Sequence, residues 1–309
     1  MPGGSEGGSR GGTILLTGGT GFLGSNLLRR LVAQGRDVVL LKRGRSDPWR
    51  IDDLLPRLRS YDLGEGVLER AFDENRIETV LHCATHYGRG GAPADILETN
   101  IILPLRLLHL AAERGARCFV NTDTILDKRV SEYSLSKRQF VEWLALYGER
   151  LVCVSVALEH FFGPGDDPTK FVSGVIRSLL LGVDRIGLTP GAQRRDFIHI
   201  DDVADAFDRI LAFCAGAGSG LYRFEVGTNA PRTIREFVEE IHGLAGRPRT
   251  VLDFRALPYR PGEVMESIVD TSALRSLGWE PRVPLREGLR RTLEAERERL
   301  ARGNADADA

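Results

Sequence analysis

The feature that most constrains this chain is a glycine-rich turn between a short apolar run and an amphipathic stretch. The apolar run TILLT at 13–17 is followed by GGTGFLG at 18–24, after which apolar residues recur at helical spacing. Gly18 permits a tight turn, Gly21 lets the backbone approach a pyrophosphate, and Gly24 lets a helix pack close to a strand. The turn therefore predicts a strand–helix unit whose helix N-terminus binds an anion.

Apolar runs and amphipathic stretches continue to alternate through the first half of the chain. Further strands are expected at 37–41, 79–83, 118–121 and 151–157, and helices at 22–34, 101–114 and 136–147. Strands that are apolar throughout belong in a parallel sheet covered on both faces. Right-handed crossovers then predict an α/β fold, a doubly wound parallel Rossmann sheet.

After Gly163 the elements become shorter, which indicates a smaller C-terminal α/β substrate lobe. Helices are expected at 169–181, 201–213, 233–244 and from 284 onward, with strands at 196–200 and 222–227. We expect a nucleotide-binding domain at 13–160 plus about 196–228, a substrate lobe at about 161–195 and 229–301, and flexible tails at 1–12 and 302–309.

Composition narrows the possible partners. The net charge is −1 with 28% charged residues, so both signs are mixed and a nucleic-acid binder is not expected. No apolar run approaches the roughly 20 residues that span a bilayer, and the N-terminus does not resemble a signal peptide. The four cysteines show no CxxC or metal-ligand spacing. We therefore expect buried, reduced thiols, no metal, no membrane association and a cytoplasmic location.

The glycine turn predicts a dinucleotide cofactor. Its contacts are expected at Gly18, Thr20, Gly21, Phe22, Leu23 and Gly24. An NAD-specific site places a carboxylate at the end of the second strand, but here Lys42 and Arg43 occupy that place. The basic pair favours NADP(H), with Arg45 assisting, although a solvated basic turn is the alternative. Asp62 and Leu63 are expected near the adenine, or else in an exposed turn.

A second group of residues is suited to acid–base chemistry. Tyr133 and Lys137 lie four residues apart at a predicted helix start, so both side chains share one face. A phenol with a pKa of about 10 is a poor acid–base group at neutral pH, and a nearby ammonium would lower that pKa. Thr122 ends the preceding strand. His86, Tyr87 and Arg89 follow the carboxyl end of another strand and are candidate substrate contacts, or else a plain surface loop.

These motifs resemble the extended short-chain dehydrogenase/reductases, the family of sugar-nucleotide epimerases, dehydratases and ketoreductases. The resemblance runs from about Thr13 to Ala301. It rests on TGGTGFLG at 17–24, HCA at 82–84, Asn100, NTDT at 121–124, YSLSK at 133–137, FFGPGDD at 161–167, RRDFIHIDDVADAF at 194–207 and RPGEVMES at 260–267.

The resemblance implies roles for individual residues. Tyr133 would be the acid–base group, Lys137 would tune it and hold the nicotinamide ribose, and Thr122 would bind the reacting sugar oxygen. Further cofactor contacts would be Cys83, Ala84, Thr85 and Asn100. The substrate would meet His86, Tyr87, Arg89, Asp123, Thr124, His160, Lys170, Arg195 and Arg260, the two arginines pairing with its diphosphate. His160 is equally compatible with a packing role.

Within the family, ATHYGR at 84–89 and LEHFFGPGDDPTKF at 158–171 resemble the CDP-abequose and CDP-paratose synthases. This resemblance implies an NADPH-dependent 4-ketoreductase acting on a CDP- or dTDP-linked deoxyhexose, and a homodimer formed through 94–114 and 136–147. The alternative is an epimerase with bound NAD. A 4,6-dehydratase is disfavoured because Asp123 is followed by Thr124 rather than Glu. A non-catalytic dinucleotide-binding protein is disfavoured by the Tyr133–Lys137 pair.

Overall fold

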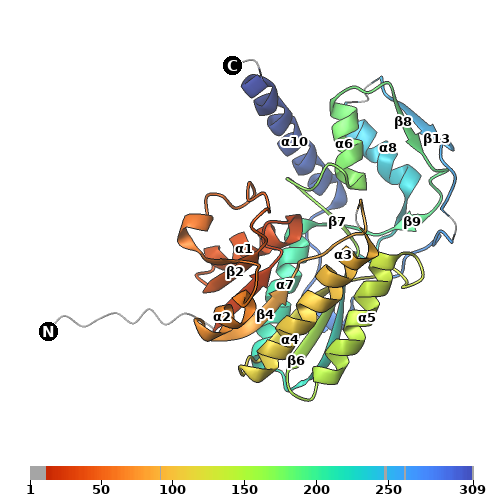
Figure 1. Cartoon of the computed structure of the whole chain (residues 1–309). Helices are drawn as coiled ribbons and strands as arrows, with labels where there is room; N and C mark the ends of the chain where they lie inside the picture. Colours follow the sequence, from red (N-terminus) through yellow and green to blue (C-terminus); the bar gives the residue numbers. More distant parts are fainter. Residues whose placement is uncertain (1–11, 91, 247–248, 261, 308–309) are drawn as a thin grey trace. The chain divides into compact units, whose positions relative to one another are not determined.

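A seven-stranded sheet forms the centre of the first part of the chain (Figure 1). The structure, a computed structural model, describes residues 12–90, 92–246, 249–260 and 262–307. The strand order is β11-β6-β5-β4-β1-β2-β3, and the neighbours from β5 through β3 pair in parallel. The strands are β1 (Thr13–Thr17), β2 (Val38–Lys42), β3 (Arg59–Asp62), β4 (Ile77–His82), β5 (Cys118–Thr124), β6 (Val152–Leu158) and β11 (Gly220–Val226).

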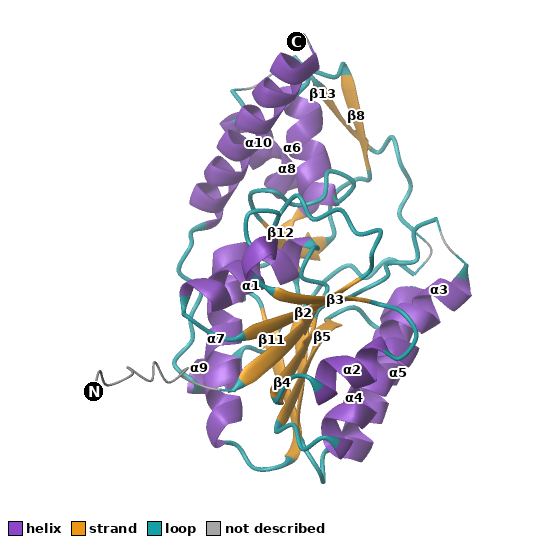
Figure 2. Ribbon diagram, turned by 60° about the vertical axis from the view of Figure 1, so that its left-hand side comes forward, coloured by secondary structure: helices purple, strands orange, loops and turns teal. Residues whose placement is uncertain are grey.

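Helices cover both faces of this sheet, which confirms the predicted doubly wound α/β class. Figure 2 shows α1 (Phe22–Ala33) on one face, with α2 (Val67–Asp73), α4 (Leu103–Glu113) and α5 (Glu132–Tyr147) on the other. Val80, Leu107, Phe119 and Phe140 belong to one buried apolar cluster between the sheet and these helices. The short elements are η1 (Leu55–Arg57), α3 (Pro93–Leu97) and the π-helical turn η2 (Glu98–Ile102).

Helix α5 begins four residues earlier than its apolar periodicity predicts. Ser131 caps the helix, because its Oγ accepts a hydrogen bond from the Ser134 N–H at 3.1 Å. The Ser134 Oγ in turn accepts from the Ser131 N–H at 3.1 Å, which completes a reciprocal cap. The early start places Tyr133 in the first turn of the helix, one turn before Lys137.

The chain separates into two compact units. The first contains the described residues up to Val156 together with Ala212–Arg223, and the second contains the rest. The elements after β6 are β7 (His160–Phe162), α6 (Phe171–Leu180), β8 (Arg185–Leu188), β9 (Arg194–Arg195), β10 (Phe197–His199), α7 (Ile200–Gly216), β12 (Arg232–Thr233), α8 (Ile234–Leu244), β13 (Val251–Phe254), α9 (Ser272–Ser276) and α10 (Leu285–Ala307). Three small sheets pair β7 with β10, β9 with β12 and β8 with β13.

The division differs from the expected one at residues 157–160, 196–211 and 224–228, which belong to the second unit. The Trp279 indole donates to the Asp202 carbonyl at 3.1 Å, and the Arg282 and Val283 N–H groups donate to the Asp202 carboxylate at 2.9 and 3.0 Å. Sequence periodicity cannot show these partners, because they lie about 80 residues further along the chain.

The cysteines are all free thiols. Cys118, Cys153 and Cys214 are buried, and Cys83 is half-buried. Burial raises the pKa of Cys153 to about 12, so that this thiol stays protonated at neutral pH. No helix in the described ranges is both long and apolar enough to cross a membrane.

A substitution at Gly24 tests how closely the glycine turn packs against helix α1. A Cβ added at Gly24 would lie 2.2 Å from the Gly18 carbonyl oxygen, so we expect Gly24→Ala to lower the free energy of unfolding by about 1–3 kcal/mol. A Cβ at Gly243, in α8, meets nothing within 4 Å, so Gly243→Ala is the matched control and should be neutral or stabilising by about 0.5–1 kcal/mol. Urea unfolding measures both, and equal effects would contradict the close-packing argument.

Candidate active site

The glycine turn has the geometry of an anion site. Gly18 has φ +71°, and a Cβ there would lie 2.5 Å from the Ala84 nitrogen. The N-cap of α1 is Gly21, and no side chain caps the helix. The first N–H groups of α1 therefore face a cradle that only glycine leaves open, and this cradle fits a dinucleotide pyrophosphate. The six predicted residues, Gly18, Thr20, Gly21, Phe22, Leu23 and Gly24, lie in this turn and the first turn of α1, and their cofactor contacts stay a prediction.

The segment after β4 is attached to the same turn. The Cys83 N–H donates to the Thr17 carbonyl at 3.2 Å, and the Ala84 N–H donates to the Thr17 hydroxyl at 3.2 Å. The Thr17 hydroxyl also lies 2.8 Å from His82 Nδ1. The predicted cofactor residues Cys83, Ala84 and Thr85 thus lie directly beside the glycine cradle.

The end of β2 differs from its sequence-based interpretation. Lys42 and Asp62 are register partners on β2 and β3, and their side chains form an ion pair. Asp62 is the last residue of β3 rather than a loop residue, and the Leu63 N–H donates to the Lys42 carbonyl at 2.7 Å. The Lys42 ammonium, which was expected to bind a 2′-phosphate, therefore already has an anionic partner in Asp62. Arg43 is exposed.

Lys137 lies at the centre of the catalytic constellation. Its Nζ donates to the Thr85 hydroxyl at 2.8 Å and to the Thr122 carbonyl at 2.9 Å, and the residue is only 2% exposed. Burial lowers the pKa of Lys137 to about 8, against the opposing influence of Asp123 and Cys83. The ammonium therefore links α5 to the carboxyl ends of β4 and β5.

The pKa of Tyr133 is raised rather than lowered. Burial is the main cause, Tyr87 adds to it, and the Thr124 hydroxyl opposes it. The Tyr87 ring lies 5.1 Å from the Tyr133 ring, tilted by 41°. The expectation that Lys137 would lower this pKa therefore does not describe this structure, because the ammonium donates to Thr85 and Thr122 instead. A protonated phenol is suited to donating a proton.

The three residues that end β5 have separate environments. The Thr122 hydroxyl donates to the His82 carbonyl at 3.1 Å, within the sheet. The buried Asp123 carboxylate accepts from the Ser155 hydroxyl at 3.0 Å and from the Thr124 N–H at 2.8 Å. The structure therefore brings Thr124, rather than Thr122, against the Tyr133 phenol.

Asn100 organises the loop after β4. Its Oδ1 accepts from the His86 N–H at 2.8 Å, and its Nδ2 donates to the His86 carbonyl and to the Ser136 hydroxyl, each at 2.9 Å. The side-chain amide thus makes internal contacts, and the cofactor contact expected of Asn100 stays a prediction. It fixes the turn that carries Tyr87, while Arg89 lies in the exposed part of the loop.

Four predicted substrate residues lie in the second unit. Arg195 is buried and forms an ion pair with Glu263. His160 Nδ1 lies 2.9 Å from the buried Glu159 carboxylate, which also accepts from the Ser267 hydroxyl. Lys170 pairs with Asp166 at 3.0 Å, and Arg260 is exposed.

The sequence analysis missed Ser136, Ser155, Glu159, Glu263 and Ser267. Ser136, Ser155, Glu263 and Ser267 each contact a partner that is distant in the chain, whereas Glu159 contacts its neighbour His160 as well as the distant Ser267. Four of the five lie inside motifs that the sequence does show: Ser136 in YSLSK, Glu159 in LEHFFGPGDDPTKF, and Glu263 and Ser267 in RPGEVMES.

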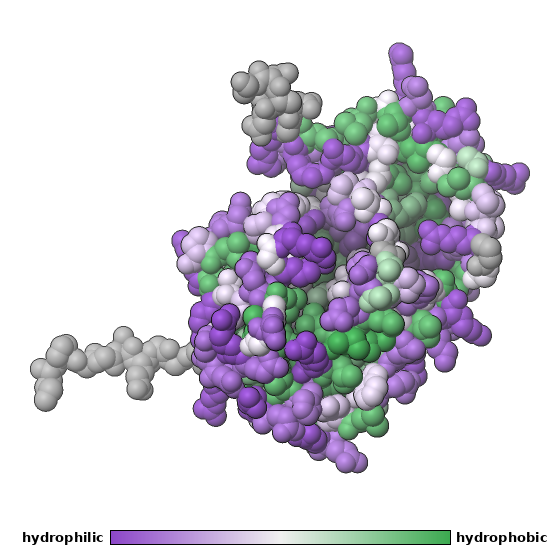
Figure 3. Space-filling view, in the orientation of Figure 1, coloured by the Kyte–Doolittle hydropathy of each residue, from purple (hydrophilic) through white to green (hydrophobic). Residues whose placement is uncertain are grey.

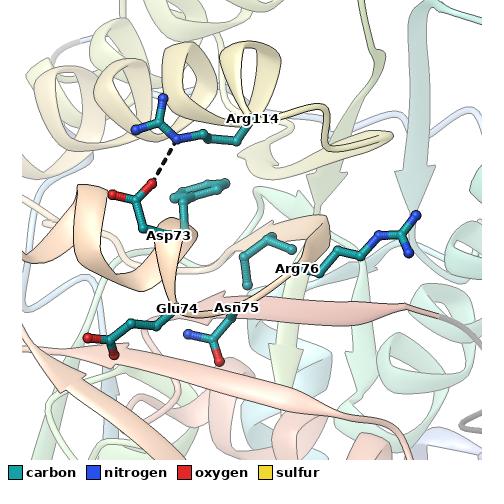
Figure 4. Close-up of a pocket in the computed structure, with 7 residues that line it drawn as sticks. Asp73, Glu74, Asn75, Arg76 and Arg114 are labelled. Atoms are coloured by element: carbon teal, nitrogen blue, oxygen red, sulfur yellow. Dashed lines mark hydrogen bonds and ion pairs between the residues drawn. The ribbon is translucent and has the colours of Figure 1, made fainter.

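Figure 4 shows a separate surface hollow of about 370 Å³ in the first unit. Its lining includes Asp73, Glu74, Asn75, Arg76 and Arg114, with Asp73 and Arg114 joined at 2.9 Å. It lies at the amino end of β4, whereas the glycine cradle and Lys137 lie at the carboxyl ends of the strands. We therefore do not assign it to the active site. The described residues contain no cluster of His, Cys, Asp and Glu side chains that could hold a metal.

Residues 14–227 match the NAD dependent epimerase/dehydratase family. The chain belongs to this family, which lies within the extended short-chain dehydrogenase/reductases, and it is an NAD(P)-dependent oxidoreductase.

Individual relatives cover almost the whole chain. It is 34% identical to a CDP-abequose synthase of Salmonella muenchen, over 91% of this chain and 96% of the relative. It is 30% identical to a UDP-glucose 4-epimerase of Mycolicibacterium smegmatis, over 91% and 97% respectively. Among solved structures, the Thermus thermophilus UDP-glucose 4-epimerase in complex with NAD is 25% identical, with a TM-score of 0.79 over 92% of this chain and 99% of that one.

Lys137 gives a pH-dependent prediction. Unfolded lysine keeps its proton up to about pH 10.5, whereas the folded side chain loses it near pH 8. Between these values the unfolded chain binds more protons, so the contribution of Lys137 to stability rises with pH. The unfolding free energy of the wild type minus that of Lys137→Met should rise by about 1 kcal/mol between pH 8.5 and 9.5. Subtracting the two unfolding free energies largely cancels the pH-dependent contributions of the buried thiols and of Tyr133, because these groups titrate in both proteins. Urea unfolding at both pH values measures the difference. A difference that is the same at pH 8.5 and pH 9.5 would contradict the lowered pKa of Lys137.

Proposed function

We propose that this protein is an NADPH-dependent 4-ketoreductase of a nucleotide-linked deoxyhexose, with a CDP- or dTDP-sugar as substrate. The observation that carries the proposal is the half-buried Tyr133 phenol, with a raised pKa, one helical turn from the Lys137 ammonium. The CDP-abequose synthases of Salmonella, at 34% and 29% identity, support the substrate class.

The chain's own residues define the proposed mechanism. Bound NADPH supplies a hydride to C4 of the keto sugar. Tyr133 gives its proton to the carbonyl oxygen, so the ketone becomes an alcohol. Lys137 would hold the nicotinamide ribose, one helical turn from the phenol. The Thr124 hydroxyl beside Tyr133 would give the carbonyl oxygen a second donor, and Thr122 would do so only by releasing the His82 carbonyl.

The substrate's nucleotide diphosphate is proposed to bind the second unit. Arg195 and Arg260 carry guanidinium forks that pair with phosphate oxygens. Arg195 is already paired with Glu263, so a phosphate that binds Arg195 would have to displace the Glu263 carboxylate or share the guanidinium with it. His160 and Lys170 remain proposed contacts, and so do His86, Tyr87 and Arg89 of the first unit.

One assay tests the reaction. Purified protein with NADPH and a CDP-, dTDP-, UDP- or GDP-4-keto-deoxyhexose should consume one NADPH for each alcohol formed, followed by absorbance at 340 nm. Tyr133→Phe should lower kcat by about 10²–10⁴-fold, because the proton donor is lost, while NADPH binding persists. The matched control is Tyr147→Phe at the end of the same helix, which should keep wild-type turnover. Full activity of Tyr133→Phe would refute the proposed proton donor.

The second candidate is an epimerase that keeps NAD bound. The Lys42–Asp62 ion pair favours it, because that pair weakens the case for a 2′-phosphate site, and the matched epimerases support it as well. Such an enzyme would invert C4 of an ordinary sugar nucleotide with no added cofactor. Detecting that product by NMR, with no NADPH oxidation, would select this candidate.

We also propose a homodimer. Leu97 and Ile102, on α3 and η2, and Trp143 and Leu146, on α5, are 42–70% exposed, and these elements pack side by side. Figure 3 shows hydrophobic residues gathered over α4 and α5. An apolar face shared by neighbouring helices fits a second copy of the same face.

Light scattering tests the dimer. The wild type should have the mass of two chains, and a Trp143→Glu/Leu146→Glu variant should have the mass of one, because buried charges oppose association. Val251, 51% exposed in the second unit, gives the control Val251→Glu, which should stay dimeric. A monomeric wild type, or a dimeric double variant, would contradict the proposed interface.

A further inference from the structure

Two of the buried cysteines lie side by side at the amino end of β5. Cys118 is the first residue of this strand, and Cys214 lies in the last turn of α7. The Cys118 Sγ is 3.0 Å from the Cys214 Sγ, and the two residues are free thiols that are 1% and 3% exposed. This distance is about 1 Å longer than an S–S bond of about 2.05 Å, so a small movement would join the two sulfurs.

The backbone segments that carry the two thiols are also fastened to each other. Arg117, the residue before Cys118, donates from Nε to the Cys214 carbonyl at 3.1 Å. Its Nη2 donates to the Ala217 carbonyl at 3.4 Å, just after α7 ends. A cation at the last carbonyls of a helix stabilises that end of the helix. These contacts hold the end of α7 against the start of β5 and keep the two cysteines together.

Strand geometry separates this pair from the third buried cysteine. Phe119 and Cys153 belong to the apolar cluster between the sheet and the helices α4 and α5. Successive side chains of a strand point to opposite faces of the sheet, so Cys118 points away from the face that carries Phe119. Cys214, rather than Cys153, is therefore the sulfur that Cys118 can reach.

Cys214 lies where a helix opens most readily. Helix α7 ends at Gly216, and residues 217–219 after it are half-buried or exposed. The contact with Cys214 and burial raise the pKa of Cys118, so the closed pair stays protonated and resists oxidants. Helix ends open locally at a low free-energy cost, and such an opening brings the Cys214 thiol into contact with solvent. Oxidation of the pair therefore proceeds through brief opening of the last turn of α7.

We propose that a peroxide oxidises Cys118 and Cys214 to a disulfide that fixes the last turn of α7 to β5. One thiolate attacks the O–O bond of hydrogen peroxide and becomes a sulfenic acid, and the first water leaves. The second thiol attacks the sulfenic sulfur, the S–S bond forms and the second water leaves. The two thiols thus lose two electrons and two protons, and the peroxide is reduced to two molecules of water.

The cross-link closes a long loop at a distance from the cofactor turn. Cys118 and Cys214 are 96 positions apart, and a disulfide restricts the unfolded chain more as the loop that it closes becomes longer. Cys118 begins β5, whereas Lys137 contacts Thr122 near the carboxyl end of the same strand. We therefore expect oxidation to stabilise the fold and to leave dinucleotide binding unchanged.

Peroxide treatment of the full chain tests the proposal. After hydrogen peroxide is added and removed, mass spectrometry should show the loss of two hydrogen atoms, and peptide mapping should join the peptides that contain Cys118 and Cys214. The unfolding temperature, followed by circular dichroism, should rise by about 5–10 °C, and dithiothreitol should reverse the change. Calorimetric titration should give NADP⁺ and NAD⁺ affinities within about twofold of those of the untreated protein.

Three variants locate the cross-link. Cys214→Ala and Cys118→Ala each remove one of the two sulfurs, so neither variant should lose the two hydrogen atoms or gain stability on oxidation. Cys153→Ala is the matched control, because it removes an equally buried thiol from the same sheet and should cross-link as the wild type does. The unfolding temperature of each untreated variant reports whether it is folded, and the two cysteine positions are tested independently of each other.

Every contrary outcome overturns the inference. Oxygen atoms added to either cysteine without a cross-link, or a cross-link that includes Cys153 or Cys83, would refute the pairing. So would the absence of a cross-link in a urea concentration just below unfolding, where the last turn of α7 opens more often. A cross-link that leaves the unfolding temperature unchanged would refute the stabilisation. None of these results bears on the proposed ketoreductase, because the pair lies at the opposite end of β5 from the Lys137 contacts.

Discussion

The buried ammonium of Lys137 holds together the parts of the first unit on which its chemistry depends. Its two hydrogen bonds reach Thr85, after β4, and Thr122, in β5, while the lysine itself belongs to α5. An ammonium removed from water is costly unless such partners receive its protons. The same contacts fix the first turns of α5 against the carboxyl ends of two strands, so they also position Tyr133.

The environment of Tyr133 favours one direction of proton transfer. Burial and the neighbouring Tyr87 ring keep the phenol protonated, and the lysine near it remains largely charged at neutral pH because its pKa is about 8. A protonated donor beside a cation is prepared to neutralise negative charge as it forms on a carbonyl oxygen. This arrangement supports reduction, and the anchored Asp123 carboxylate adds a local charge that helps to keep Lys137 protonated.

Cofactor selection depends on contacts that strand register decides. Lys42 and Asp62 meet only because β2 and β3 pair with these residues opposite each other. That pairing gives the Lys42 ammonium an anionic partner, which the basic pair at the end of β2 does not reveal in the sequence. The residue type gives the charge of a side chain. Only its contacts in the fold show whether that charge is already paired with another group.

The sequence predicted the elements that depend on local patterns. The glycine turn, the first helix and the parallel strands follow from backbone sterics and hydrophobic periodicity, which act over a few residues. It also placed Tyr133 and Lys137 on one helix face. It did not predict that 196–211 would pack with the second unit, since Trp279 and the 282–283 backbone hold Asp202 there from a distant position.

The sequence by itself determined the fold class, the glycine cradle and the types of side chain that carry the chemistry, because each is encoded in neighbouring residues. Only the tertiary structure decided that Asn100 supports the His86 turn, that Lys42 is paired with Asp62, and that Cys118 lies beside Cys214. These outcomes depend on strand register and on burial, which bring together groups that no local pattern connects and which set the pKa values of Lys137 and Tyr133.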